Sequence, residues 1–328
     1  MGTPRSNSAT AIAHPNIALI KYWGVLDGAQ NLPANGSISM TLDGLQADTT
    51  VTLSPSLQDD TFTLNGLSAS EEQRRAVGAH LDRIRELAHL ETRAEVKSTS
   101  NFPEAAGIAS SASGFAALTL AGCAACGLEL SSQDLSRLAR KGSGSACRSV
   151  FGGYVEWLAG PTDAESYARQ LHGPEHWPLI DWVAVVDRRP KAVSSRAGHA
   201  LAMSSPLQAA RVADAPRRLR ACRQALAERD FEGLAAVVEL DSNMMHSVMM
   251  TSSPPILYWA PATIQLMQQI TQWRRQGLSV CYTIDAGPNV HCLTTAGDAD
   301  EVGRLLEGQP DVTALLRAPV GGQPQVLA

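Results

Sequence analysis

The chain has 328 residues, of which 44% are hydrophobic and 18% charged, and its formal net charge is −5. This length allows two ordinary domains or one large one around a substantial core. The acidic balance argues against non-specific nucleic-acid binding, which needs a basic face. No apolar run is long enough to span a bilayer, and the first residues are polar without an apolar signal core. We therefore expect a soluble, cytoplasmic protein with no nucleic-acid or membrane partner.

Residues 16–24, Asn-Ile-Ala-Leu-Ile-Lys-Tyr-Trp-Gly, place Asn16 and Lys21 around a short apolar strand. A lysine in that setting is usually a solvated strand end. Beside a bound phosphate it could instead stabilise negative charge on a group in transfer. The residues alone leave both interpretations open.

The next part of the chain predicts three strands and a helix. The strands are expected over 49–53, 61–64 and 95–99, with a turn at Asn65-Gly66 after the second. A capping box, Ser68-x-x-Glu71, predicts the start of the helix. Its apolar stripe consists of Val77, Leu81, Ile84 and Ala88.

Small and hydroxyl residues fill 101–114, just before an alanine-rich stretch over 115–126 that predicts a helix. A helix N-terminus carries unsatisfied N–H groups and a partial positive charge, so it favours a phosphate. Gly107 would let the backbone approach an anion, and Ser110 and Ser111 could donate hydroxyls or help hold a metal. The Gly-Lys-Ser/Thr ending of a Walker loop is missing. A serine-capped buried helix explains the segment equally well.

The same helix contains Cys123 and Cys126, the only two of the six cysteines that are close in sequence. They could form a metal or redox pair, but no second Cys/His pair completes a tetrahedral zinc site. Buried thiols in a reducing compartment explain them better.

A short amphipathic helix is predicted over 131–141 and ends at Gly142. The segment 142–149 then reads Gly-Ser-Gly-Ser-Ala-Cys-Arg-Ser, and its Gly-Ser pairs give a backbone that can wrap an anion. Arg148 adds a planar fork for a carboxylate or phosphate. A helix end followed by a turn with a surface arginine is the alternative, but so many polar residues in a short stretch favour an anion site.

A strand is predicted over 154–158, and the Pro/His/Gly-rich stretch 160–178 is the best linker candidate. We therefore expect an N-terminal domain over 1–178 and a C-terminal domain over 179–328. The continuous apolar run 180–186 predicts a strand buried on both faces. Beyond it, a basic, hydroxyl-rich patch suits a second phosphate-bearing ligand, though a plain surface turn explains it as well; the patch consists of Lys191, Ser194, Ser195 and Arg196.

The C-terminal part predicts longer helices, over 204–228, 231–250 and 261–276, then strands over 278–284 and 290–294 and a helix over 299–307. The Pro/Gly-rich tail from Ala318 onward is expected to be poorly ordered. Because strands and helices are mixed rather than strictly alternating, we predict an α+β protein with two lobes.

Asp285 follows an apolar strand and opens the turn Asp-Ala-Gly-Pro-Asn. A half-desolvated carboxylate there would have a raised pKa and would be a candidate base. Capping the turn is the more common role of such an aspartate. Two anion cradles, a basic patch, a lysine and a candidate base together suggest phosphoryl transfer between two phosphate-bearing molecules.

These segments together resemble the GHMP kinase superfamily and, within it, the mevalonate diphosphate decarboxylases. The segments 142–149 and 285–289 are specific to the decarboxylase branch, whereas general GHMP kinases share only the Pro-x₃-Gly-x-x-Ser-Ser loop. The resemblance implies an N-terminal α/β lobe, a C-terminal ferredoxin-like lobe, an active site between them, and a homodimer. It covers residues 16–24, 32–42, 101–115, 140–157, 193–196, 241–243 and 285–289.

The resemblance also implies ATP-dependent decarboxylation of a 5-phosphorylated mevalonate in isoprenoid biosynthesis, with Mg²⁺ and transient phosphorylation of the C3 oxygen. Asp285 would take the proton of the C3 hydroxyl, Lys21 would support the developing charge, and Arg148 with Asn16 would hold the departing carboxylate. The ATP phosphates would bind at Pro103, Gly107, Ala109, Ser110 and Ser111, with Ser111 nearest the magnesium. The 5-phosphate end would contact Tyr22, Ser143, Ser145, Ser195 and Arg196, and Arg148 would bind the substrate through its carboxylate.

Two residues depart from the family pattern. The lysine that usually follows Tyr-Trp-Gly and contacts the substrate diphosphate is Val25 here, and Glu104 replaces the usual threonine of the phosphate loop. Because a pocket one cation short should favour a ligand with fewer phosphates, we expect mevalonate 5-phosphate as substrate and isopentenyl phosphate as product. The alternative is the diphosphate, giving isopentenyl diphosphate, with Arg188, Arg189 or Lys191 replacing the missing lysine. A GHMP kinase without decarboxylation and a non-enzymatic nucleotide-binding module are further alternatives.

Overall fold

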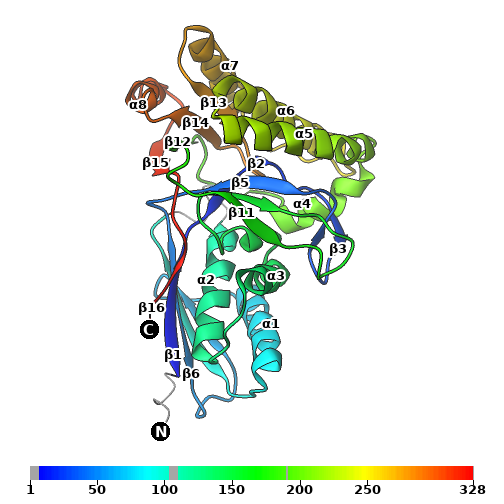
Figure 1. The fold of residues 1–328 in the computed structure, drawn as a ribbon, viewed down its shortest axis with the longest axis vertical. Helices are drawn as coiled ribbons and strands as arrows, with labels where there is room; N and C mark the ends of the chain where they lie inside the picture. The colour runs from blue at the N-terminus through cyan, green and yellow to red at the C-terminus, as the bar shows by residue number, and fades with distance from the viewer. Residues whose placement is uncertain (1–6, 103–109, 190, 328) are drawn as a thin grey trace.

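The computed structural model describes residues 7–102, 110–189 and 191–327. Its three larger sheets follow one another along the long axis of the molecule (Figure 1). The chain alternates between the first and the second sheet in its N-terminal half and then forms the third sheet. Its last strand returns to the first sheet.

The first sheet has six strands and lies at the end of the molecule that contains both termini (Figure 1). Helix α2 (Ser110–Ala125) packs on two of its strands, and α1 (Glu71–Ala88) and α3 (Ser132–Gly142) pack against α2. In order, the strands are β16 (Gln325–Leu327), β1 (Ser8–Ala13), β6 (Ala47–Leu53), β9 (Ala94–Ser100), β7 (Thr61–Leu64) and β8 (Leu67–Ser68).

Two local sequence signals of this sheet have different outcomes in the structure. The predicted turn at Asn65-Gly66 joins β7 to β8, and both residues have positive φ, as a two-residue hairpin turn requires. The predicted capping box is wrong by two residues. Ser70, not Ser68, caps α1, and its partner is Gln73, because Ser68 is still paired within β8.

The C-terminal tail is ordered, contrary to our expectation. β15 (Ala314–Pro319) belongs to the third sheet, and β16 pairs with β1 through Thr10↔Leu327 and its neighbours. Without β16, β1 would be an exposed edge strand with unpaired backbone groups. The Pro/Gly residues before β16 therefore mark the crossing between two sheets and not the start of disorder.

The second sheet has the order β11 (Ala168–His172), β10 (Tyr154–Trp157), β5 (Ser37–Thr41) and β2 (Asn16–Ile20). The stretch 160–178 is therefore more than a linker, since β11 lies inside it and pairs with β10. Composition failed here because Pro and Gly flank the strand while residues 168–172 contain neither. A separate hairpin, β3 (Val25–Asp27) with β4 (Leu32–Pro33), follows β2.

The third sheet is antiparallel, with the order β13 (Val280–Thr283), β14 (Val290–Thr295), β12 (Leu179–Val185) and β15. Helix α6 (Phe231–Met250) packs against both β13 and β2, so it touches strands of two sheets. A core of buried apolar side chains continues between them, from Ile17 and Met40 to Val238 and Leu293. The remaining helices are η1 (Gly144–Cys147), α4 (Ser195–Leu201), η2 (Ala202–Ser204), α5 (Gln208–Glu228), α6 (Phe231–Met250), α7 (Pro261–Arg275) and α8 (Ala299–Glu307).

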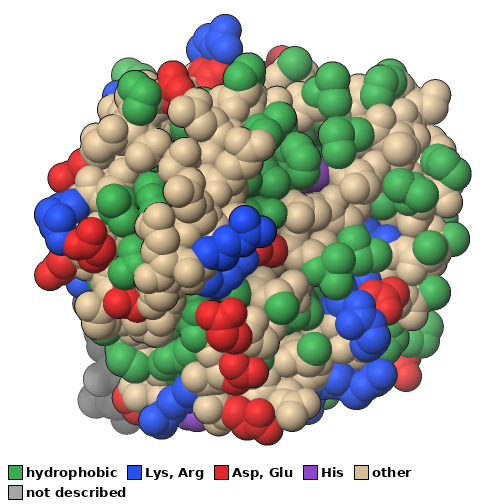
Figure 2. Space-filling model, turned by 90° about the horizontal axis from the view of Figure 1, so that it is seen from above, with side chains coloured by type: hydrophobic (Ala, Val, Ile, Leu, Met, Phe, Trp, Pro, Cys, Tyr) green, Lys and Arg blue, Asp and Glu red, His purple; other side chains and the backbone are tan. Residues whose placement is uncertain are grey.

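The described helices include none that is both long and apolar enough to cross a membrane. On the face seen in Figure 2, apolar side chains form several separate groups between charged ones. Exposed apolar residues of the helical end of the molecule are Leu240, Met250, Leu257 and Ile264. Scattered apolar residues of this kind are normal on a surface, and the homodimer stays a prediction.

Candidate active site

A buried ion pair joins the two predicted catalytic residues that come from opposite halves of the chain. Lys21 directly follows β2 and Asp285 follows β13, and Lys21 Nζ lies 2.5 Å from Asp285 Oδ1. The lysine side chain is 1% exposed and the carboxylate 25% exposed. The carboxylate is therefore the partner that a substrate can reach.

The electrostatics of Asp285 differ from our expectation. Burial raises the pKa of its carboxyl, as predicted, but the attraction of Lys21, with contributions from His291 and Arg148, outweighs burial and leaves the pKa below its usual range. The predicted raised pKa is thus wrong because Lys21 lies within hydrogen-bonding distance. Asp285 is ionised at neutral pH and ready to accept a proton.

The backbone beside both residues is held by α6. Asp241 Oδ2 accepts the N–H of Lys21 at 2.6 Å, and Ser242 Oγ accepts the N–H of Ile284 at 3.0 Å. Asp241 Oδ1 also accepts from Arg218 Nε at 2.7 Å, and Arg211 Nη2 donates to the carbonyl of Lys21 at 2.9 Å. These four polar side chains are buried, and the charges of the two arginines oppose that of the aspartate.

Sequence reasoning gave these holding residues no role. Asp241 entered it only as part of the family resemblance, and Arg211 and Arg218 lay unremarked within the helix predicted over 204–228. One signal was available, because the two arginines are seven residues apart and so share one face of α5. Both are buried on that face.

Arg148 is a buried cation without an acidic partner among the described residues. Its Nε and Nη2 donate to Asn16 Oδ1 at 3.2 and 3.0 Å, and its Nη1 donates to Ser37 Oγ at 2.6 Å. Burial lowers the pKa of this guanidinium, and the nearby Asp285 opposes the shift. Asn16 is itself fixed by donating to Ser149 Oγ at 2.8 Å. An uncompensated, oriented guanidinium is suited to a carboxylate or phosphate ligand.

The segment that precedes Arg148 lies against Tyr22. Ser145 belongs to η1, and a side chain at Gly144 would meet the ring of Tyr22 at 2.7 Å, so the close approach requires glycine. Burial raises the pKa of the Tyr22 hydroxyl. Ser143 Oγ lies 3.2 Å from Ser111 Oγ at the start of α2. The two predicted anion cradles are therefore neighbours.

The predicted basic patch also reaches the site. Lys191 Nζ donates to Ser195 Oγ and to the carbonyl of Ala286, each at 2.9 Å, which ties the start of α4 to the turn after Asp285. Arg196, on the first turn of α4, forms no ion pair with another described residue. His199, which no sequence signal indicated, packs against Tyr22 with 4.1 Å between the ring centroids and the ring planes tilted by 31°.

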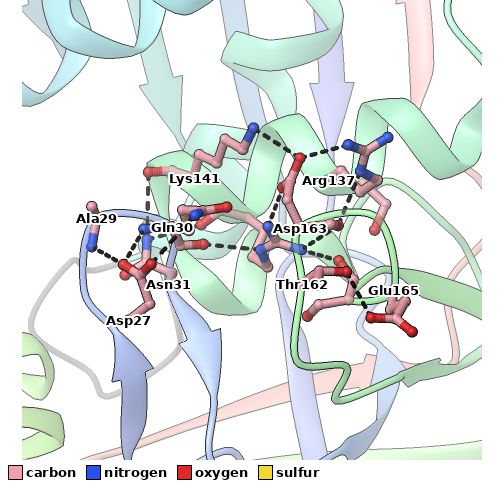
Figure 3. A network of polar contacts seen from close by, with 12 residues as sticks. Asp27, Ala29, Gln30, Asn31, Arg137, Lys141, Thr162, Asp163 and Glu165 are labelled. Carbon is pink, nitrogen blue, oxygen red and sulfur yellow. Dashed lines mark hydrogen bonds and ion pairs between the residues drawn. The ribbon is translucent and has the colours of Figure 1, made fainter.

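A charged network fixes the hairpin that begins with Val25 to the end of α3 (Figure 3). Arg140 Nε donates to the carbonyl of Gln30 at 3.0 Å, and Asn31 Nδ2 donates to the carbonyl of Arg140 at 2.9 Å. On the other side, Asp163 accepts hydrogen bonds from Arg137, Arg140 and Lys141. The network therefore fixes the turn of the hairpin at Gln30 and Asn31, while Val25 is held at the other end by pairing with Pro33 of β4.

The serines predicted to bind the ATP phosphates lie beside a cavity with a different lining. An open cavity of about 200 Å³ lies between α1, α2 and the first sheet, beside Ser110 and Ser111. Both serines lie in the first turn of α2, so the helix begins earlier than the predicted 115. Pro103, Gly107 and Ala109 lie outside the described residues. The cavity is lined mainly by Phe62, Leu64, Val77, Phe115 and Leu118, with the hydroxyls of Ser98 and Ser100.

Cys123 lies in the later part of α2 and Cys126 directly follows that helix, and neither lines this cavity. Cys123 and Cys126 are free thiols, and burial raises the pKa of Cys123 to about 12, so it is an unreactive thiol at neutral pH. In the described part of the chain, no group of three or more His, Cys, Asp or Glu residues could hold a metal ion. Ser111 as a magnesium ligand stays a prediction.

Comparison with known proteins identifies the family. The diphosphomevalonate decarboxylase-like N-terminal domain family matches residues 13–168, and the mevalonate 5-diphosphate decarboxylase C-terminal domain family matches residues 182–314. The chain belongs to the diphosphomevalonate decarboxylase family. Its relatives include the diphosphomevalonate decarboxylase of Ganoderma lucidum, 39% identical over 91% of this chain and 81% of that protein. The Saccharomyces cerevisiae enzyme is 40% identical over 86% of this chain and 76% of its own length.

Solved structures of diphosphomevalonate decarboxylases have the same fold. The Staphylococcus aureus mevalonate diphosphate decarboxylase has a TM-score of 0.93 at 35% identity, covering 98% of both chains. A complex of MDDEF with MVAPP, AMPPCP and magnesium has a TM-score of 0.92 at 37% identity, again covering 98% of both chains. These findings confirm the predicted α+β, two-lobed GHMP kinase fold and the predicted enzyme class, a decarboxylase.

Proposed function

We propose that this diphosphomevalonate decarboxylase family member converts mevalonate 5-diphosphate to isopentenyl diphosphate with ATP. The observation that carries the proposal is the Lys21–Asp285 ion pair beside the unpaired, buried guanidinium of Arg148. This arrangement offers a base for a hydroxyl and a cation for a carboxylate within one site. The relatives named above carry the diphosphate name, which supports this substrate over the monophosphate.

The residues divide the reaction between them. Asp285 accepts the proton of the C3 hydroxyl, and Lys21 stabilises the negative charge of the aspartate and of the oxygen that becomes phosphorylated. Arg148, oriented by Asn16, holds the C1 carboxylate. When the C3–O bond breaks, the oxygen leaves with its electron pair as phosphate. The C1–C2 bonding pair then forms the C2=C3 double bond as CO₂ departs.

The nucleotide half fits an adenosine phosphate. Its cavity offers apolar walls for a base or sugar face and hydroxyls at one side, and Ser110 and Ser111 at the start of α2 lead from it toward Ser143. Mg-ATP supplies the phosphoryl group and the charge neutralisation that its transfer needs. The bound AMPPCP and magnesium of the similar MDDEF structure support this assignment.

Val25 bears on how many phosphates the substrate carries, because it stands where the family usually has a lysine that contacts the substrate diphosphate. Our expectation of a monophosphate lacks support from the comparisons, so another cation must replace the missing lysine. Of the three candidates, Arg189 pairs with Asp187 and is exposed, and Arg188 donates to the carbonyl of Thr313. Lys191 is the one that lies in the site, through its contacts with Ser195 and Ala286. We therefore assign the compensating charge to Lys191.

The test compares kcat/KM for mevalonate 5-phosphate and mevalonate 5-diphosphate with Mg-ATP, measuring ADP and CO₂ separately. The proposal predicts a higher value for the diphosphate and one CO₂ per ADP. ADP without CO₂ would indicate a kinase, and a preference for the monophosphate would revive the Val25 argument. Val25→Lys should raise the preference for the diphosphate further, because it adds a cation to the pocket. An unchanged ratio would place selectivity elsewhere.

A further inference from the structure

Two consecutive residues of α6 hold the backbone at the ends of the two catalytic strands. Asp241 binds the N–H of Lys21 and Ser242 binds the N–H of Ile284, the residue before Asp285. Both side chains are 0% exposed. One helix therefore fixes both ends of an ion pair whose members are 264 residues apart in sequence.

These hydrogen bonds replace sheet hydrogen bonds that end at the same place. The pairing of β2 ends at Ile20, one residue before Lys21, and the pairing of β13 ends at Thr283, one residue before Ile284. Beyond those points the backbone N–H groups need another partner, because they are buried away from water. The chosen partners belong to a single rigid helix rather than to two separate loops.

Further contacts reinforce each attachment. Ser242 Oγ also lies 3.4 Å from the carbonyl of Ile284, and His246 Nε2, one turn along α6, lies 3.3 Å from that carbonyl. Burial lowers the pKa of His246 to about 3, so it is a neutral hydrogen-bond donor here. On the lysine side, the carbonyl of Lys21 accepts from Arg211, which lies 3.8 Å from Asp241.

We propose that Asp241 and Ser242 are positioning residues that set the separation of Lys21 Nζ and Asp285 Oδ1 and thereby keep Asp285 ionised and aimed at the substrate. The inference rests on the proposed function, since it assigns these residues a part in delivering the base. Neither side chain bonds to a catalytic side chain, and both act through the backbone. A shift of α6 relative to either strand would change the distance across the pair.

The charged and titratable groups around Asp285 make this separation important. Several cations contribute to its field, but Lys21 has the largest influence after burial. A longer separation would weaken the attraction of Lys21, which opposes the effect of burial on the pKa of Asp285. The protonated carboxyl would then be favoured. The groups facing Asp285 are Lys21, Arg148, Lys191, His199, His246 and His291.

The test is a double-mutant cycle between Ser242→Ala and Lys21→Gln, with kcat as the readout. If Ser242 acts through the pair, Ser242→Ala lowers kcat about tenfold in the wild-type background and by less than about twofold once Lys21 is replaced. A merely structural role gives the same fold-loss in both backgrounds, and that result would overturn the inference.

Ser247→Ala is the matched control. Ser247 lies on the same helix, but its Oγ donates to the carbonyl of Asn243 within α6 and links to neither strand. Its loss should leave kcat within about twofold of wild type, as expected for an intrahelical hydroxyl. An equal loss in Ser247→Ala and Ser242→Ala would also count against the inference.

A second readout covers the case in which Ser242→Ala folds poorly. His246→Gln keeps Ser242 and removes the imidazole that lies 3.3 Å from the Ile284 carbonyl and packs on Trp259 and Tyr258, and it should move the acid limb of the kcat–pH profile to higher pH. A limb that coincides with wild type would contradict the proposal. Wild-type turnover of mevalonate 5-diphosphate is measured first, so that a failure of the proposed function is seen separately from a failure of the positioning role.

Discussion

The acceptor half and the nucleotide half of the proposed site differ in the kind of side chains that line them. The acceptor half consists of buried charges with fixed partners, of which Lys21, Asp285 and Arg148 are the central three. The nucleotide half is an apolar cavity edged by hydroxyls, and the charged groups that hold the acceptor half have no counterpart in its lining. Charges that take part in bond breaking must be placed accurately, whereas the adenine ring of a nucleotide can be held by the shape of a cavity and the apolar area that it buries.

This contrast has a structural cause. The acceptor half lies where the second and third sheets meet, so each charge is fixed by residues distant in sequence, such as Asp241 for Lys21. The nucleotide half lies between two helices and one face of the first sheet, and its lining comes from the N-terminal half of the chain. We expect substitutions in the acceptor half to affect both catalysis and stability, and those in the nucleotide half to affect mainly ATP binding.

The largest expected effect is the loss of the base. Asp285→Asn should lower kcat by about 10²- to 10⁴-fold, because an amide cannot accept the C3 hydroxyl proton. ATP binding, measured by calorimetry, should stay within about twofold of wild type, since the nucleotide cavity is separate. Near-normal turnover would remove Asp285 from the role of base, and lost ATP binding would break the separation of the two halves.

Next in size is the effect of the buried aspartate on stability. Asp241→Asn should lower the free energy of unfolding by about 3–5 kcal/mol, because it leaves Arg218 and Arg211 without their buried counter-charge. Asp214→Asn is the matched control, since Asp214 also pairs with Arg218 but its side chain is 33% exposed. Its replacement should cost less than about 1 kcal/mol. Urea denaturation measures both, and equal losses would contradict the importance of burial.

These residues also show where sequence reasoning reached its limit. Lys21, Asp285 and Arg148 could be selected because short local strings carry them, and the structure brings them together. The pKa of Asp285 was predicted in the wrong direction, because the sequence does not show that Lys21 lies 2.5 Å away. Asp241 and Ser242 belong to the segment 241–243 of the resemblance, but no role could be given to them, since they matter through strands that fold against α6.

The fold, like the site, could be predicted from the sequence only in part. Periodicity gave the mixed α+β class and most helices, but several strands were missed, among them residues 8–13, 37–41, 168–172, 314–319 and 325–327. Residues 168–172 and 325–327 are short strands without a strong pattern of their own, and each is held by a partner strand, β10 for the first and β1 for the second. The division at residues 178 and 179 stays a prediction, although β12 begins at Leu179.

A smaller effect is expected from the pH dependence of the acceptor half. Lys21→Gln removes the attraction that opposes burial, so the pKa of Asp285 should rise and the acid limb of the kcat–pH profile should move to higher pH. At neutral pH kcat should fall about tenfold to hundredfold, through loss of charge stabilisation. Lys97→Gln is the control, because Lys97 pairs with Glu95 on the surface. An acid limb unchanged in Lys21→Gln would show that other cations keep Asp285 ionised.

The smallest effect should come from the nucleotide half. Leu64→Ala removes apolar contact area from the cavity wall and should raise KM for ATP about threefold to tenfold, leaving kcat unchanged. Leu67→Ala, on the adjacent strand β8, is the control, since Leu67 is 73% exposed and does not line the cavity. Leu64 contributes only apolar contact area to the cavity wall. Its loss should therefore weaken ATP binding equally in the ground state and in the transition state. A fall in kcat for Leu64→Ala would mean that the cavity wall also aligns the γ-phosphate, and the contrast between the two halves would fail.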